Sequence, residues 1–379
     1  MKINRNFINV GKIIYLGLIF KFFKMLGVKE NYIFFSSFYG RQYSGDPKAL
    51  HQELKRRKLD YQCIWLLNDK SLNVYDDIIV RRYSLKHLYY LARAKYRIDN
   101  CQESYLLKPH KDTVYIQTWH GTPLKKIAQD IDDNSFDEIK KDWLLDSQSW
   151  NYLTSPNRNV SNIFYKSFGL DEKTDILEFG NPRNDIFFSE DKEQKITKIK
   201  DSLGIAKNKK VILYAPTFRD GFESKASLNF SLEDMSNALG DNYVFLIRTH
   251  SNVVNKIPNI ENNTTFKDVS RYSDAQELLL ISDILISDYS SIFIDYSLLS
   301  RKIIFYAYDY EFYKSKCRDL YFDFETFVPG PIVQNSADLI KEILSGSFDK
   351  EKVKRFSDDY NTNTATASYD VLKHVGIIK

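Results

Sequence analysis

The chain has 379 residues, which exceeds the size at which one hydrophobic core usually stops growing, so two domains of ordinary size are expected. Hydrophobic residues make up 43% of the chain and aromatic residues 15%, with only 14 Gly and 9 Pro, which excludes a disordered or low-complexity protein. The 54 basic and 50 acidic side chains nearly balance at a formal net charge of +4, which argues against a nucleic-acid-binding protein.

The first 28 residues predict a basic amphipathic helix. Their apolar run, residues 13–20, is too short to span a bilayer and has no small-residue cleavage site after it, so neither a transmembrane helix nor a secretion signal is expected. Lys12, Lys21 and Lys24 alternate with apolar and aromatic residues, as in helices that lie in an anionic membrane interface. The alternative is a terminal helix that packs on its own domain.

Two series of short apolar runs alternate with helix-like stretches, which predicts βαβ units and parallel sheets. The first series comprises residues 32–35, 63–67, 96–99, 114–119 and 152–154. The second comprises residues 211–214, 243–248, 284–287 and 303–306, which are near-continuously apolar, as in strands covered on both faces. The polar, lysine-rich stretch 189–210 separates the two series. We therefore predict a segment 1–28 and two Rossmann-like α/β domains, 29–190 and 191–379.

The cysteines do not predict a disulfide framework or a zinc site. Cys63, Cys101 and Cys317 lie far apart, and none belongs to a CxxC pair. A reducing cytoplasm suits them best.

Polar residues directly after predicted strands are the candidate functional residues, because ligands of open parallel sheets bind beyond the carboxyl ends of the strands. His120 directly follows the fourth run of the first series, and Gly121 permits a sharp turn or a close approach of substrate. An imidazole, with an ordinary pKa near 6.5, can accept the proton of an attacking hydroxyl and contribute about 10²–10⁴ in rate. Taken alone, a histidine at a strand end is more often structural.

Basic residues and hydroxyls follow the strands of the second series. Arginine is suited to phosphate oxygens, although a surface ion pair is the simpler role for an isolated one. Hydroxyls at the start of a predicted helix can cap it, and the free N–H groups there favour phosphate. The carboxylate of Asp288, after the third strand, would repel a phosphate bound there, so nearby cations would have to compensate for its charge. The residues in question are Thr217, Arg219, Arg248, His250, Ser290 and Ser291.

Five segments resemble the markers of a known family, in the family's order. They read Trp-His-Gly-Thr-Pro-Leu-Lys-Lys-Ile at 119–127, Phe-Gly-Asn-Pro-Arg-Asn-Asp at 179–185, Tyr-Ala-Pro-Thr-Phe-Arg at 214–219, Arg-Thr-His at 248–250 and Ser-Asp-Tyr-Ser-Ser at 287–291. The chain thus resembles the CDP-glycerol glycerophosphotransferases, which include teichoic acid primases and polymerases.

The resemblance implies a GT-B-like fold, in which two Rossmann-like domains face a central cleft. It implies transfer of glycerol phosphate or another polyol phosphate from a CDP-activated donor to a hydroxyl of a lipid-linked, undecaprenyl-type acceptor, with release of CMP. The acceptor domain would be 29–190 and the CDP-polyol donor domain 191–379. The enzyme would lie peripherally at the cytoplasmic face of a bacterial membrane and take part in the synthesis of teichoic acid or a related polymer.

The resemblance also implies roles for individual residues. His120 matches the base that acts on the acceptor hydroxyl, and His250 matches the residue that steadies the donor diphosphate. No metal or other cofactor is implied, since basic side chains and helix dipoles can supply the electrostatic stabilisation. The remaining predicted donor-phosphate contacts are Thr217, Arg219, Arg248, Ser290 and Ser291. Further candidates in the cleft are Gly121, Thr122, Asn181, Arg183 and Asp288.

Several alternatives stay open from the sequence. The length is closer to that of the short primases, whereas the run at 120–126 looks more like the polymerases. The sequence therefore does not decide whether the enzyme adds one polyol phosphate or many. Glycerol, ribitol or another polyol is also undecided. The nearest rival function is that of a GT-B nucleotide-sugar glycosyltransferase of cell-surface polysaccharide synthesis. A non-catalytic membrane-docking subunit is the other rival, against which the presence of both His120 and His250 argues.

Overall fold

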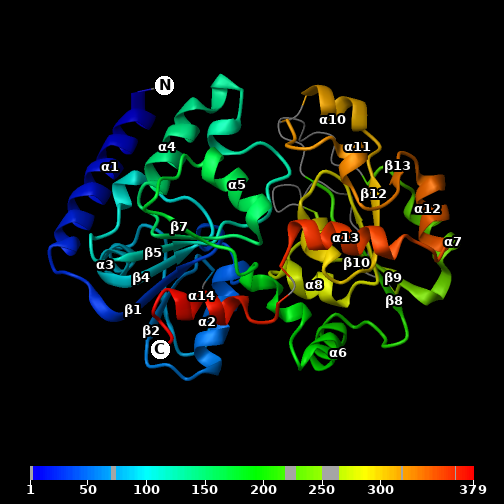
Figure 1. Ribbon diagram of the computed structural model, residues 1–379, viewed down its shortest axis with the longest axis horizontal. Coiled ribbons are helices and arrows are strands. Elements are labelled where there is room, and N and C mark those ends of the chain that lie inside the picture. The colour runs from blue at the N-terminus through cyan, green and yellow to red at the C-terminus, as the bar shows by residue number, and fades with distance from the viewer. Residues whose placement is uncertain (1–2, 70–73, 218–227, 250–263, 317–318, 363) are drawn as a thin grey trace. The chain divides into compact units, whose positions relative to one another are not determined.

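The structure is a computed structural model that describes residues 3–69, 74–217, 228–249, 264–316, 319–362 and 364–379. The chain forms two compact units (Figure 1). Unit 1 comprises Met1–His120, Ile127–Asp185 and Thr366–Lys379, and unit 2 comprises Gly121–Lys126 and Ile186–Ala365. The division after Asp185 lies close to the boundary expected near residue 190. The sequence did not predict that the short segment Gly121–Lys126 would belong to unit 2, or that the C-terminal residues Thr366–Lys379 would belong to unit 1.

Unit 1 contains a seven-stranded parallel sheet in the order β3-β2-β1-β4-β5-β6-β7. Alternate residues of β1 point to opposite faces, so Ile33 and Phe35 belong to one apolar cluster and Phe34 to another. Helices α2 and α14 cover the first face, and α1 and α3 cover the second (Figure 1). The strands are β1 (Lys29–Ser36), β2 (Gln62–Leu66), β3 (Ile78–Val80), β4 (Ala94–Asp99), β5 (Val114–Gln117), β6 (Tyr152–Thr154) and β7 (Asp175–Leu177). The helices are α1 (Ile3–Lys24), α2 (Gly45–Arg56), α3 (Leu85–Arg93), α4 (Asp137–Ser147), α5 (Arg158–Ser167) and α14 (Ala367–His374).

Unit 2 contains a six-stranded parallel sheet in the order β10-β9-β8-β11-β12-β13. Helices α7 and α12 pack on one face, and α6, α8, α9 and α13 pack on the other. The strands are β8 (Lys210–Tyr214), β9 (Tyr243–Ile247), β10 (Phe266–Asp268), β11 (Ile284–Ser287), β12 (Lys302–Tyr306) and β13 (Ile332–Val333). The helices are α6 (Lys192–Ser202), α7 (Leu232–Leu239), α8 (Ala275–Ile281), α9 (Ile292–Ser297), α10 (Tyr310–Lys316), α11 (Phe324–Phe327), α12 (Ser336–Leu344) and α13 (Lys350–Tyr360).

The prediction of two parallel-sheet α/β units is confirmed, and each of the predicted runs contains a strand. In each sheet the chain order reverses between two central strands, β1 and β4 in unit 1 and β8 and β11 in unit 2. Loops at the carboxyl ends of such a pair diverge and leave room for a ligand. The two switch points are therefore the first places to look for functional residues.

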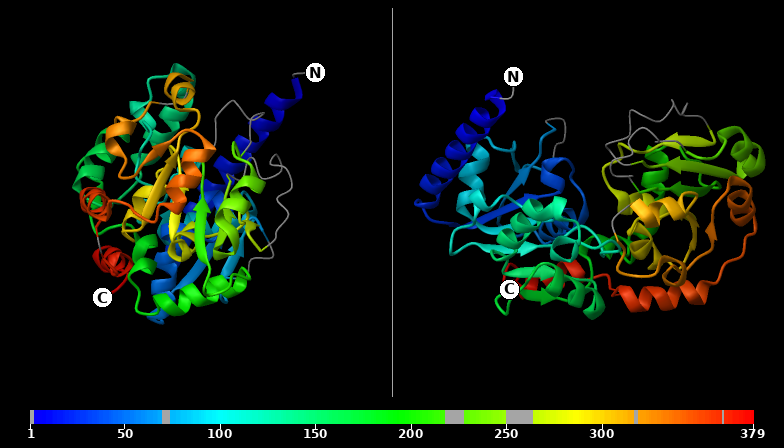
Figure 2. Two further views of the ribbon diagram at one scale, coloured as in Figure 1. Left: turned by 90° about the vertical axis from the view of Figure 1, so that its right-hand side faces the viewer. Right: turned by 90° about the horizontal axis from the view of Figure 1, so that it is seen from above.

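Helix α1 packs beside α3, as Figure 1 and the right-hand view of Figure 2 show. Leu16 and Phe20 are buried in the apolar cluster of unit 1, and Phe23 contacts Tyr89 of α3 with ring centroids 5.4 Å apart. This face of the helix therefore packs on its own domain. Within the described residues no helix has the length and apolar character needed to cross a bilayer.

Candidate active site

His120 follows β5 at the switch-point end of the unit 1 sheet. The strand ends at Gln117, and Trp119 adopts a φ of 52°, in the left-handed region that costs energy for any residue other than glycine. The turn places the indole of Trp119 against the imidazole of His120, with ring centroids 4.2 Å apart and planes 29° apart. Trp119 is buried, whereas His120 is exposed. A strained, packed turn thus presents a histidine to solvent.

A hydrogen bond defines the tautomer of His120. Its Nδ1 lies 2.7 Å from the carbonyl oxygen of Asn100. Because a carbonyl can only accept, Nδ1 carries the proton, and Nε2 of the neutral ring is left as the proton acceptor. Asn100 is itself fixed, since its Oδ1 accepts from the N–H of Phe38 at 2.8 Å and its Nδ2 donates to Oγ of Ser37 at 3.2 Å. The asparagine thereby joins the carboxyl ends of β1 and β4.

The electrostatic surroundings of His120 favour the neutral imidazole. Burial lowers the pKa of His120 from its ordinary value of 6.5, the hydrogen bond to Asn100 opposes this, and the nearby cation of Arg183 lowers the pKa further. The side chain still reaches solvent, which limits the desolvation. A ring that is neutral at pH 7 can act as a general base.

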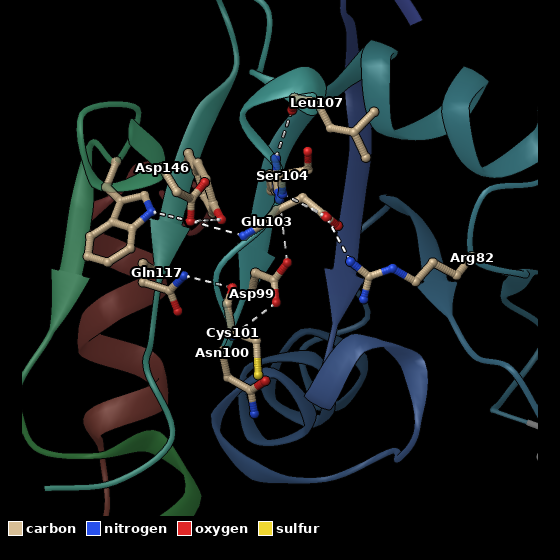
Figure 3. Close-up of polar contacts among 12 residues, drawn as sticks. Arg82, Asp99, Asn100, Cys101, Glu103, Ser104, Leu107, Gln117 and Asp146 are labelled. Atoms are coloured by element: carbon tan, nitrogen blue, oxygen red, sulfur yellow. Dashed lines mark hydrogen bonds and ion pairs between the residues drawn. The ribbon is translucent and has the colours of Figure 1, made fainter. Parts of the chain in front are cut away.

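Charged side chains gather around the segment that follows β4 and begins with Asn100 (Figure 3). The guanidinium of Arg97, a residue only 1% exposed, lies 3.5 Å from the carboxylate of Asp99. The other oxygen of Asp99 accepts from the N–H of Cys101 at 3.1 Å. Burial raises the pKa of Asp99 to about 7, although the Arg97 cation opposes this rise. The pair braces the turn that carries Asn100.

Asp146 of α4 continues this network. Its Oδ2 accepts from the N–H of Glu103 and from the indole N–H of Trp150, both at 3.1 Å (Figure 3). Burial raises the pKa of Asp146 to about 6. Glu103 in turn forms an ion pair with Arg82 at 2.8 Å. Five buried or half-buried charged residues, Arg82, Arg97, Asp99, Glu103 and Asp146, thus form the network around the segment that follows β4.

Two predicted cleft residues, Asn181 and Arg183, are buried in unit 1. The carboxylate of Asp46 accepts from the backbone N–H of Arg183 at 2.8 Å and from its guanidinium at 2.6 Å. Asp46 is only 1% exposed, so this is a buried ion pair. Arg183 therefore acts on His120 through its charge.

A predicted donor-site residue, Thr217, and a predicted cleft residue, Asp288, come together at the switch point of unit 2. The carboxylate of Asp288, after β11, accepts from the N–H of Thr217, after β8, at 2.7 Å. Oγ of Ser287 donates to the carbonyl of Ala215 at 3.0 Å. Asp288 is 1% exposed, so its charge holds the loop together and does not face outward.

Ser290 and Ser291 precede α9, as predicted, but they do not cap it as expected. Ser291 occupies the N-cap position without a side-chain hydrogen bond to the helix, and Oγ of Ser290 accepts from Ile292 N–H only at 3.4 Å. Helix α9 has six residues, so its dipole is small. A Cβ on Gly121 would lie 3.1 Å from Oγ of Ser291, so a larger residue at 121 would require the Ser291 side chain to shift.

The motif at 119–127 divides between the two units. His120 is the last residue of its segment in unit 1, and Gly121–Lys126 belongs to unit 2. There the N–H of Lys126 donates to the carbonyl of Asp319 at 2.8 Å, and the N–H of Tyr321 donates to the carbonyl of Leu124 at 2.9 Å. Thr122 is buried, and its Oγ1 has no hydrogen-bond partner among the described residues.

The remaining predicted residues are only partly described. Arg248 follows β9, and its guanidinium donates to the carbonyl of Tyr272 while burial lowers its pKa. Arg219 and His250 lie outside the described residues. Sequence reasoning missed Asn100 and Gln117 in unit 1, although Asn100 directly follows a predicted strand.

One cluster of the described residues has the composition of a metal site. Ligand atoms of His51, Cys63 and Asp77 lie within 4.8 Å of one another. The carboxylate of Asp77 already pairs with His51 at 2.7 Å and with Lys55 at 2.5 Å. Burial also raises the pKa of Cys63 to about 12, whereas metals bind the thiolate. The absence of a metal requirement stays a prediction.

Comparisons with known proteins agree with the motifs. The family model described as CDP-Glycerol:Poly(glycerophosphate) glycerophosphotransferase matches residues 18–375. The chain is 38% identical over 369 residues to the teichoic acid poly(glycerol phosphate) polymerase of Bacillus spizizenii, covering 93% of this chain and 91% of that protein. It is 40% identical over 342 residues to the teichoic acid glycerol-phosphate transferase of Staphylococcus aureus, covering 85% of this chain and 86% of that protein.

A solved structure extends the likeness to the fold. The wall teichoic acid polymerase TagF matches with a TM-score of 0.87 at 32% identity, covering 98% of this chain and 94% of that one. The relatives resemble the chain over both units, and the family predicted from the motifs is confirmed. The chain belongs to the CDP-glycerol:poly(glycerophosphate) glycerophosphotransferase family.

Proposed function

We propose that the chain transfers glycerol phosphate from CDP-glycerol to a hydroxyl of a lipid-linked acceptor in teichoic acid synthesis, releasing CMP. The observation that carries this function is the fixed tautomer of His120, whose Nδ1 donates to Asn100 and whose Nε2 can accept a proton. Glycerol is the favoured polyol because both named relatives act with glycerol phosphate. Two parallel-sheet units with a switch point each are also what a GT-B-like transferase requires.

The transfer is a single displacement at phosphorus. The acceptor oxygen forms a bond to the phosphorus that carries glycerol while its proton passes to Nε2 of His120. The bond from that phosphorus to the bridging oxygen breaks, and CMP leaves with the electron pair. Negative charge grows on CMP, so donors fixed near the diphosphate lower the barrier. In this scheme Thr217, Arg248, Ser290 and Ser291 supply donors in unit 2, together with Arg219 and His250.

The observations support some of these roles more than others. Ser291 is half-buried beside Gly121 and does not cap its helix, so its hydroxyl is suited to a ligand. Arg248 has one guanidinium nitrogen bound to Tyr272, which fixes the direction of the group. Asp288 and Arg183 instead stabilise their own loops, Asp288 through its hydrogen bond to Thr217 and Arg183 through its ion pair with Asp46.

The test of the function is CMP release across a panel of CDP-glycerol, CDP-ribitol, UDP-sugars and GDP-sugars. We expect CMP from CDP-glycerol only when a lipid-linked or lipid-mimicking hydroxyl acceptor is present. Sugar transfer from a UDP or GDP donor, without CMP release from any CDP-polyol, would establish the glycosyltransferase instead. No turnover with any donor and acceptor would favour a non-catalytic subunit.

We also propose that α1 binds an anionic membrane surface, which would place the enzyme peripherally at the cytoplasmic face. Opposite the packed stripe of Leu16 and Phe20, a second apolar stripe recurs at three- and four-residue spacing and is exposed. Its exposed fractions are 64% for Leu18 and 55% for Phe22, and Met25, directly after the helix, is 76% exposed. Lys21 flanks this stripe and can contact lipid phosphates.

The double variant Leu18→Glu/Phe22→Glu is expected to lose flotation with vesicles that contain anionic lipid. Point variants are better than deletion of the helix, because deletion would expose the core that Leu16 and Phe20 cover. Wild-type binding should weaken as salt screens the lysines. The control is Leu344→Glu, since Leu344 is an exposed leucine of unit 2, at 47%. Equal flotation of the double variant and the wild type would move the membrane contact elsewhere.

A further inference from the structure

Gln117, the last residue of β5, has a side chain that connects two loops. The residue is 0% exposed. Its Nε2 donates to the carbonyl of Cys101 at 3.1 Å (Figure 3). Its Oε1 accepts from the N–H of Trp119 at 2.9 Å. Cys101 directly follows Asn100, and Trp119 directly precedes His120. One buried amide therefore bonds to the neighbours of both partners in the His120–Asn100 hydrogen bond.

The sheet explains why this position can act on both loops. Gln117 lies opposite Asp99 in the parallel register of β4 and β5. The ladder continues one bond further, from the N–H of Thr118 to the carbonyl of Asp99 at 2.8 Å, and then the strands separate. Beyond this point the Gln117 side chain connects the two chain segments in place of the backbone. Its amide donates to the loop after β4, at Cys101, and accepts from the loop after β5, at Trp119.

The turn at Trp119 depends on such a bond. A φ of 52° at a tryptophan is sterically costly, and an unpaired buried N–H would add a further cost. The Gln117 oxygen satisfies that N–H directly. If the bond were absent, the Trp119–His120 turn could relax toward ordinary backbone angles, and the distance from Nδ1 of His120 to Asn100 would be free to change.

We propose that Gln117 is a positioning residue, which keeps His120 in its Nδ1–H tautomer with Nε2 available as the base. Part of this inference rests on the proposed function, because the effect on turnover requires His120 to be the base. The tautomer itself does not depend on turnover. Few side chains could replace glutamine, because the position requires a donor and an acceptor at the same time.

Two substitutions distinguish this role from simple packing. Gln117→Met keeps the volume and loses both hydrogen bonds, so the imidazole should populate both tautomers, and kcat should fall about 10- to 100-fold with the donor KM unchanged. Gln117→Glu can make both bonds only while its carboxyl is protonated. Burial raises the pKa of such a carboxyl, so this variant should approach wild-type turnover near about pH 5.5 and lose it progressively toward about pH 8.5.

The charged and titratable groups near this position belong to β4, β5, α4 and the two loops. An ionised carboxylate at position 117 would be repelled by the Cys101 carbonyl and by the Asp99 carboxylate, which supports the expected direction of the pH effect. The groups are Arg97, Asp99, Cys101, Tyr115, His120 and Asp146.

The direct measurement is the tautomer of His120 by nitrogen-15 NMR of histidine-labelled protein, with the signal assigned by its loss in His120→Asn. Wild type should show a protonated Nδ1, and Gln117→Met a mixture of tautomers. Asn151→Ala is the matched control, because the Asn151 amide accepts from Tyr115 N–H at 2.8 Å at the opposite end of β5. This control should leave both the tautomer and the pH profile unchanged.

The possible failures are distinct. An unchanged tautomer in folded Gln117→Met protein, or a Gln117→Glu pH profile that matches the wild type, overturns the positioning role. Full turnover in His120→Ala removes the base from the proposed function, whatever the tautomer shows. A shifted tautomer with full turnover in Gln117→Met would confirm the effect of Gln117 on the tautomer but overturn its role in catalysis, because turnover would then not depend on the tautomer.

Discussion

Replacing His120 by alanine is expected to lower kcat by about 10²–10⁴ while the affinity for the CDP-activated donor stays near that of the wild type. The reason is that a base acts on the acceptor proton only in the transition state. Because His120 is exposed, its removal should cost little stability, and circular dichroism with thermal melting provides that control. Donor affinity is measured by calorimetry.

His250→Ala provides the contrast. A side chain that donates to the diphosphate contributes to binding and also stabilises the charge on departing CMP, so this variant should lose both affinity and turnover. Near-wild-type turnover of folded His120→Ala protein would exclude His120 as an essential base. Loss of donor binding in that variant would assign it to the donor site instead. In the wild type, the acid limb of kcat/KM should have its midpoint below pH 6.5, because burial lowers the pKa of His120.

The strands that sequence patterns failed to predict share one structural property. They are β3, β7, β10 and β13, and they form the four outer edges of the two sheets. Each has only two or three residues, and an edge strand is covered less completely than a central one. The central strands have long apolar runs because both of their faces are buried. Apolar runs therefore predict the centre of such a sheet better than its edges.

The sequence predicted residues of the candidate site only where they directly follow a strand. The crevice rule predicted His120, Thr217 and Asp288, and the last two are in contact. Gln117 could not be found in this way, because it is the last residue of a strand and does not follow one, and because its hydrogen-bond partner Cys101 is distant in sequence. The sequence also does not indicate that the chain passes from unit 1 to unit 2 between His120 and Gly121, because the motif is continuous there.

Arg97→Met is expected to lower the free energy of unfolding by about 3–5 kcal/mol at neutral pH, the largest stability effect we predict. Methionine keeps most of the packing over the Tyr115 ring, to which the guanidinium is 4.1 Å distant. It removes the cation, however, and leaves the buried carboxyls of Asp99 and Asp146 without compensation. Urea unfolding measures the loss. The control is Arg158→Met, because the Arg158 side chain is 80% exposed and its ion pair should contribute less than about 1 kcal/mol.

The sign of the pH dependence separates a charge effect from a packing effect. Asp99 has a pKa of about 7 in the folded protein and 3.8 ordinarily, so the folded state binds an extra proton between these values, and this group lowers stability as pH rises through that window. Without Arg97 the folded pKa of Asp99 rises further. The deficit of Arg97→Met should therefore be small where the carboxyls are protonated in both states, below about pH 4, and should grow toward neutral pH. A deficit of equal size across this range would mean that Arg97 stabilises unit 1 by packing alone.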